Sequence, residues 1–299
     1  MGDRKSGSWA RNGCLTLLAL GAVVAIVLGV VSGVALRQNR NASFEQQTFE
    51  HSIADPTTAV AELTGLVRLR LELHTAAVSV KPGAAGQPLR IEADYDPRQY
   101  VLRQESEHAA GADVLTVELR PLGSEMMALL RVKLGGRPPM LRITLPRGIP
   151  LEIEGSLSRT YAAMELGGLS LASTDVMFVD GGVKVSFREP LAAPMERIRI
   201  NGHRGSLSIV SLGNASPKDA RLFQHVGAVD LDLRGAWSRD ARLSIVAGAA
   251  GGSLWLPDNV TLQGLDEHRG VGLSGDAETQ RPTLDVSLRA RMGRLVVVD

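Results

Sequence analysis

Residues 226–233, VGAVDLDL, contain a glycine followed by a strict alternation of apolar and polar side chains. Successive side chains of an extended strand point to opposite faces, so the apolar residues share one face and Asp230 and Asp232 share the other. Similar units recur along the chain: GGLSLAS (167–173), GGVKVSF (181–187), RGSLSIV (204–210), GGSLWLP (251–257) and MGRLVVVD (292–299). The sequence therefore predicts a repetitive all-β protein.

The spacing of these units indicates how the strands are arranged. From Gly182 onward, four units begin about 22 to 25 residues apart, which is the spacing of stacked β coils. In such coils each turn buries its apolar face against its neighbours. A sandwich, whose strands recur every ~8–12 residues, is the alternative. The repeat favours the solenoid.

Two further repeated segments resemble those of a known family. ITLPRGIPLEI (143–153) and LWLPDNVTLQG (254–264) follow one plan, and residues 227–260 add a Gly-Ala-Trp turn between two strands. In these features the chain resembles the toast-rack and adhesin-like group of bacterial envelope proteins, which includes the C-terminal domain of membrane regulators that respond to cell-wall stress. The resemblance covers residues 140–299 and less closely 63–140. It implies a right-handed, single-layer β-solenoid of short strands, usually without known activity.

The N-terminal region predicts a membrane anchor. Residues 13–36 form a run without a charge, and it exceeds the roughly 20 apolar residues that a helix needs to span a bilayer. The flanking positive charges give only a slight bias, and the short N-terminal flank and the large C-terminal remainder both fit a cytoplasmic N-terminus at the inner membrane. A cleaved signal peptide is the alternative, because Gly33-Val34-Ala35 has small residues at the spacing that a signal peptidase reads. Gly29 and Gly33 also have the spacing of a helix-dimerisation motif.

The chain therefore divides into a cytoplasmic segment (1–12), a transmembrane helix (13–36), a linker (37–62) and an extracytoplasmic β-solenoid (63–299), with a division near residue 140 left open. Within 63–299, residues 125–134 are the one place where we expect a short helix.

Composition excludes several classes of function. The formal net charge is +1 and only 4% of residues are aromatic, so we expect no nucleic-acid partner. The single cysteine, Cys14, excludes an internal disulfide and a cysteine-based zinc site.

The aspartates raise the question of catalysis. Residues i and i+2 of a strand lie about 6.6 Å apart, a separation that some glycosidase carboxyl pairs also have. Strand alternation alone explains Asp230 and Asp232, and an acid would need burial or a like charge to raise its pKa. Weak cation binding with Asp240 is a further alternative. We predict no catalytic residue, cofactor or metal site.

Two other groups are surface candidates. His203 and His225 each precede a glycine unit by two residues, so stacked coils would bring them together. The two interpretations are a pair of metal ligands and, more simply, two residues on the surface. Arg197 and Arg199 share a strand face, which suits an anionic partner or a solvated face paired with acids.

The sequence thus predicts a non-enzymatic, membrane-anchored interaction or scaffold module of the bacterial cell envelope, with an envelope protein as partner and its oligomeric state open. The alternatives are an adhesin, or a carbohydrate-binding or hydrolysing protein that uses Asp230, Asp232 and Asp240.

Overall fold

The computed structural model describes residues 25, 29–37, 42–51, 65–109, 111–264, 281–292 and 295–298. The chain forms two compact units. The first comprises Met1–Ser43 and Gly123–Arg137, and includes a helical segment at 29–37 and helix α2 (Glu125–Lys133), which confirms the short helix expected there. Most of the predicted transmembrane helix, residues 13–36, lies outside the described residues. No helix in the described ranges is both long and apolar enough to cross a membrane.

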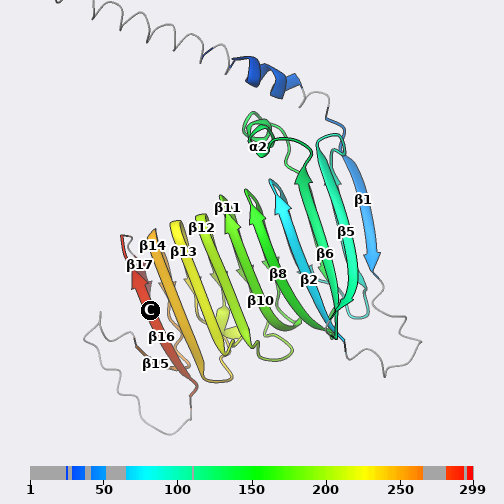
Figure 1. Cartoon of the computed structure of the whole chain (residues 1–299). Helices are drawn as coiled ribbons and strands as arrows, with labels where there is room; N and C mark the ends of the chain where they lie inside the picture. The colour runs from blue at the N-terminus through cyan, green and yellow to red at the C-terminus, as the bar shows by residue number, and fades with distance from the viewer. Residues whose placement is uncertain are drawn as a thin grey trace, which may run out of the picture. The chain divides into compact units, whose positions relative to one another are not determined.

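The second unit, Phe44–Leu122 and Pro138–Asp299, is a single sheet bent into two halves (Figure 1). Three long strands run through both halves: β12 (Arg197–Val210), β13 (Asp219–Asp232) and β14 (Ala241–Trp255). The first half also contains β5 (Tyr100–Ala109), β6 (Ala112–Pro121), β2 (Leu66–His74), β8 (Pro150–Ser158), β10 (Ser170–Val179), β16 (Thr283–Ala290) and the short β15 (Thr261–Gln263). The second half contains β1 (Glu45–His51), β4 (Leu89–Tyr95), β7 (Met140–Leu145), β3 (Ala77–Pro82), β9 (Tyr161–Glu165), β11 (Gly181–Ser186) and β17 (Leu295–Val298).

Successive turns of the chain pair in parallel. Arg197 is in register with Asp219, and Asp219 with Arg242, so the length of one turn matches the spacing of the glycine units. This parallel pairing does not fit an immunoglobulin-like sandwich, whose sheets are antiparallel. The unit is thus a mostly β, curled open sheet, and the right-handed, single-layer solenoid implied by the resemblance stays a prediction.

Glycine recurs in these units because the bend between the two halves excludes a Cβ atom. Gly205 and Gly227 both have a φ of 127° and are in register with each other. A Cβ on Gly227 would overlap the carbonyl oxygen of Gly205, and a Cβ on Gly205 would overlap that of Gly181. Only glycine combines this backbone conformation with such close approach.

The coils do not follow the order of the sequence. β2 pairs with β6 on one side and with β8 on the other, so the coil formed by β2 and β3 lies between two coils that come later in the chain. At this end, β5, β4 and β1 pair antiparallel with their neighbours. β1 lies inside residues 37–62, so this part of the predicted linker belongs to the sheet.

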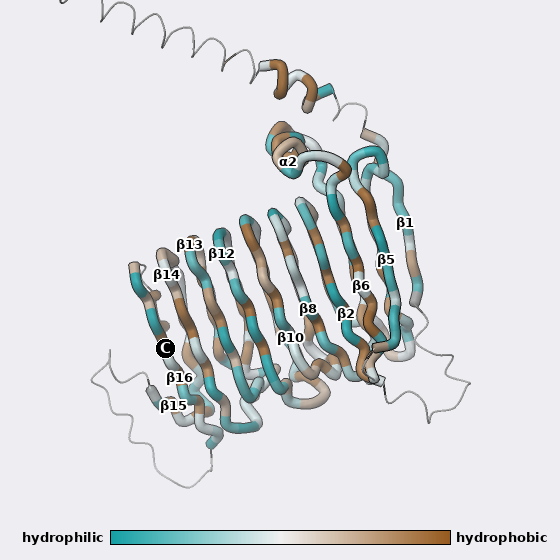
Figure 2. The backbone as a smooth tube through the Cα atoms, viewed as in Figure 1, coloured by the Kyte–Doolittle hydropathy of each residue, from teal (hydrophilic) through white to brown (hydrophobic). Residues whose placement is uncertain are grey.

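The core lies between the two halves. Hydrophobic and hydrophilic residues alternate along the strands, as the hydropathy colouring shows (Figure 2). The residues that alternation places on one side of β2 are all buried: Val67, Leu69, Leu71 and Leu73. Phe178 and Phe187 are the largest fully buried side chains. The outward residues of each half are therefore left as two broad surfaces.

Candidate functional site

The outward side chains of the first half form a surface that we call the charged face, carried by β6, β2, β8, β10, β16 and the first parts of β12, β13 and β14. One row crosses seven neighbouring strands in register: Arg68, Glu152, Ser173, Arg197, Asp219, Arg242 and Asp285. Apart from Ser173, positive and negative side chains alternate along it. Opposite charges on neighbouring strands attract and like charges repel, so the row favours this register over a shifted one.

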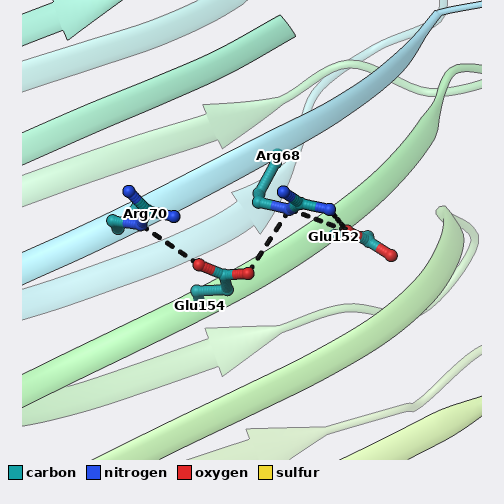
Figure 3. A network of polar contacts seen from close by, with 4 residues as sticks. All are labelled: Arg68, Arg70, Glu152 and Glu154. Carbon is teal, nitrogen blue, oxygen red and sulfur yellow. Dashed lines mark hydrogen bonds and ion pairs between the residues drawn. The ribbon is translucent and has the colours of Figure 1, made fainter. Parts of the chain in front are cut away.

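A network of ion pairs between β2 and β8 lies at one end of the charged face (Figure 3). Arg68 lies 2.8 Å from Glu152 (Nη2 to Oε2) and 3.3 Å from Glu154 (Nε to Oε1), while the Arg70 Nε lies 3.1 Å from Glu154 Oε2. The hydrogen bond to Glu152 raises the pKa of Arg68, against the opposing effect of burial. The network joins the out-of-order β2 coil to the next coil along the sheet.

The predicted candidates Arg197 and Arg199 lie further along the same face, where the charges are less well matched. Arg199 is in register with Arg221, and its contact with Asp175 is 4.0 Å long. Asp219 lies opposite Arg197 but binds Arg221 instead, at 3.0 Å. Within the described part of the chain, Arg197 has no ion pair. This region of β12 and β13 therefore carries an excess of guanidinium groups.

The three predicted aspartates have separate local partners. Asp230 accepts a 2.5 Å hydrogen bond from the Ser253 hydroxyl. Asp240 is exposed and accepts a 2.7 Å bond from the backbone N–H of Thr283, at the start of β16.

Asp232 is buried and is bound by Arg234 through the backbone N–H (3.1 Å) and two guanidinium nitrogens (2.8 and 3.1 Å). Burial alone would raise the pKa of Asp232. The hydrogen bonds and charge of Arg234, with a backbone bond from Ser211, instead hold this pKa below its ordinary value. Asp232 is thus stabilised as an anion, the opposite of what a general acid needs.

His203 and His225 lie side by side on β12 and β13, with ring centroids 5.2 Å apart and planes 7° from parallel. Phe223 extends the stack, with its centroid 6.3 Å from that of His225. All three are exposed on the sheet beside the bend. Among the residues the structure describes, no group of three or more His, Cys, Asp or Glu side chains could hold a metal ion.

Sequence reasoning missed a second surface, the outward side of the second half. There Tyr161 on β9 is 68% exposed, and Lys184 on β11 is exposed. Lys184 lies inside the unit GGVKVSF (181–187). Its polar position in the alternation of that unit was the signal that could have placed it on the outward side.

No family model matches this chain, and no curated protein matches it. Solved structures do. A candidate cell adhesion protein from Clostridium sporogenes is 11% identical, with 85% of this chain and 99% of that chain covered and a TM-score of 0.44. A candidate adhesin from Bacteroides fragilis is 8% identical (86% and 97% covered, TM-score 0.39). A candidate lipid binding protein from Parabacteroides distasonis is 9% identical (87% and 98% covered, TM-score 0.30). Membership of the toast-rack group stays a prediction.

Proposed function

We propose that this protein is a non-enzymatic interaction module of the bacterial cell envelope, which holds an envelope protein partner on its charged face. The observation that carries this proposal is the row of alternating charges across seven strands. A rigid sheet fixes these charges at strand spacing, about 4.8 Å apart. Complementary charges at fixed spacing give a protein interface its specificity and orientation.

The guanidinium excess on β12 and β13 indicates where the partner binds. Arg197 and Arg199 lie beside Arg221, and these three arginines share two carboxylates, whereas the β2–β8 end has two carboxylates for two arginines. Arginine is enriched at protein interfaces because its planar group binds carboxylates in pairs. An acidic segment of the partner is therefore the chemistry that fits.

The local partners of the aspartates count against the carbohydrate-hydrolase alternative. Asp232 is ion-paired and its pKa is lowered, while Asp240 binds the start of β16. These two carboxylates maintain the sheet and its loops, so we assign them a structural role.

We further propose that residues 13–36 anchor the protein in the inner membrane with the N-terminus in the cytoplasm. The basis is the long uncharged run, with Arg4, Lys5 and Arg11 before it and only Arg37 and Arg40 after it. The β unit then lies outside the cytoplasm, close to the membrane, as part of a toast-rack-like solenoid.

The test is photo-crosslinking in living cells with the full-length chain. A photoreactive residue replaces Arg221 on the charged face or, as a matched control, Ser206 on the opposite half. We expect a defined envelope protein to be captured from position 221 but not from 206, and the double variant Arg197→Glu, Arg199→Glu, with the probe still at 221, to abolish capture.

A chain of residues 1–60 alone controls for capture through the anchor. Equal capture of the same protein from both positions would refute the charged-face proposal, and glycan fragments without a protein would reopen the carbohydrate alternative. Protease accessibility in whole cells separates the adhesin alternative, because an adhesin must reach the cell exterior.

A further inference from the structure

The outward surface of the second half carries mostly small side chains over five neighbouring strands, β9, β11, β12, β13 and β14. We call it the flat face. Two of its rows are in register: Tyr161, Gly182, Ser206, Ala228 and Gly251, then Ala163, Lys184, Ser208, Asp230 and Ser253. Only Tyr161 and Lys184 have large side chains in these rows. A sheet face of this kind allows another flat surface to approach closely.

The charges of these two rows are arranged symmetrically about β12. Lys184 and Asp230 occupy the same row, one strand to either side of Ser208. Neither side chain has an ion pair among the described residues, although Asp230 accepts the Ser253 hydroxyl. These two rows thus carry one cation and one anion, both available to a second molecule.

Its shape has the same symmetry. Tyr161 lies two strands from β12 on one side, and Gly251 lies two strands from β12 in the same row on the other side. The Tyr161 ring leans over Gly182, since a Cβ on Gly182 would lie 3.1 Å from the Tyr161 Cδ1 atom. A projecting ring and a position without a side chain are therefore related by reflection of the row about β12.

We infer that the flat face is the contact surface for a second copy of this chain, across a two-fold axis that runs along β12 at Ser208. That axis places Lys184 of each copy opposite Asp230 of the other, and each Tyr161 ring against Gly251 and Ala228. In a two-fold interface, residue i contacts residue j and j contacts i, as this pattern requires. The occupant is a second copy because the charges and the bulk of the face complement themselves.

The contact is small, so it depends on the membrane anchor proposed above. Four strand steps and five residues give a face of about 19 Å by 17 Å, or roughly 300 Å² on each copy. A stable interface buries about 800 Å² on each partner. Anchoring two chains in one membrane raises their effective concentration and offsets this deficit. Gly29 and Gly33, in the helical segment at 29–37, have the spacing that lets two membrane helices pack closely.

Cysteine crosslinking of the full-length chain in membranes tests the axis. In a Cys14→Ser background, Ser208→Cys places two thiols together at the proposed axis, whereas Ser244→Cys, also a half-exposed serine at a strand centre, lies on the charged face. With a short bismaleimide, we expect a covalent dimer from Ser208→Cys and at least about tenfold less from Ser244→Cys. Equal yields from the two variants would overturn the inference.

Charge reversal distinguishes this dimer from non-specific association. In the Ser208→Cys chain, Lys184→Asp or Asp230→Lys alone places like charges opposite each other, and we expect about a tenfold lower yield. The double reversal restores opposite charges and should restore the yield. Failure of the double variant to recover, with the single variants still folded by circular dichroism, would overturn the inference. Partner capture from position 221 is read separately, so the two proposals fail independently.

Discussion

Arg239 and Glu196 are 43 residues apart in the sequence, yet the Arg239 Nη1 donates to the Glu196 Oε1 at 2.8 Å. The same guanidinium donates from Nε to the Ser216 carbonyl oxygen at 3.1 Å and from Nη2 to the Met195 carbonyl oxygen. These acceptors lie in the loops that precede β12 and β13, and Arg239 itself precedes β14. One side chain therefore joins three successive coils on the loop side of the sheet.

Replacement of Arg239 should loosen this connection. We expect Arg239→Ala to lower the free energy of unfolding by about 1–3 kcal/mol, because two backbone carbonyls lose a charged donor. Urea denaturation of the purified full-length protein followed by circular dichroism measures it. Arg221→Ala is the matched control and should cost less than about 1 kcal/mol, since among the described residues Arg221 pairs with Asp219 alone, on its own strand at a solvent-exposed site. Equal effects of the two substitutions would contradict a clamping role for Arg239.

The same pair predicts a pH dependence. The hydrogen bond and charge of Arg239 lower the pKa of Glu196. A carboxylate whose pKa is lower in the folded state contributes stability above its unfolded pKa, and the contribution disappears as the pH falls through the folded value. Glu196→Gln should therefore be less stable than the parent at pH 7, and the difference should be smaller at pH 2 to 3. A stability difference that persists unchanged at low pH would show that the charge is not responsible.

The glycines stacked at the bend, Gly205 and Gly227, predict that any added side chain there greatly lowers the free energy of unfolding. Gly205→Ala introduces a Cβ at a φ of 127° and against the Gly181 carbonyl, so we expect a loss of about 2–4 kcal/mol. Gly86→Ala is the control, because Gly86 has a φ of 77° but no atom within 4 Å of the added Cβ. It should cost only about 1 kcal/mol. Thermal denaturation of both variants distinguishes overlap from backbone strain, and similar losses would exclude the close approach as the cause.

These glycines also explain why sequence reasoning identified the coils. Each coil needs a glycine at its bend, as at Gly205 and Gly227, so the interval between these two glycines equals the length of one coil. His203 and His225 occupy equivalent positions in that repeat, and their stacked rings follow from it. Periodic local requirements of this kind are visible in a single sequence.

Features that depend on pairing between distant segments could not be predicted from the sequence. The alternation of β2 indicates a half-buried strand but not that its neighbours are β6 and β8, which follow it only after several intervening strands. β1, with the sequence EQQTFEH, is too polar to be recognised and becomes a strand by pairing with β4. The clamp formed by Arg239 likewise has no local motif, because its acceptors are backbone carbonyls in other coils.

Asp232 is the most buried of the candidate acids. Its lowered pKa means that the carboxylate stabilises the fold above its unfolded pKa, near 4, and ceases to do so as the pH falls through the folded value. Asp232→Asn removes the charge that binds Arg234, so it should lower the urea midpoint at pH 7 by a small amount and have a smaller effect at pH 2.

Asp230→Asn is the control, because an asparagine oxygen still accepts the Ser253 hydroxyl, and it should leave the midpoint nearly unchanged at either pH. If Asp232→Asn left stability unchanged at pH 7 but abolished binding of the protein to isolated cell-wall glycan, Asp232 would be a ligand-binding residue and the structural role assigned to it would be wrong.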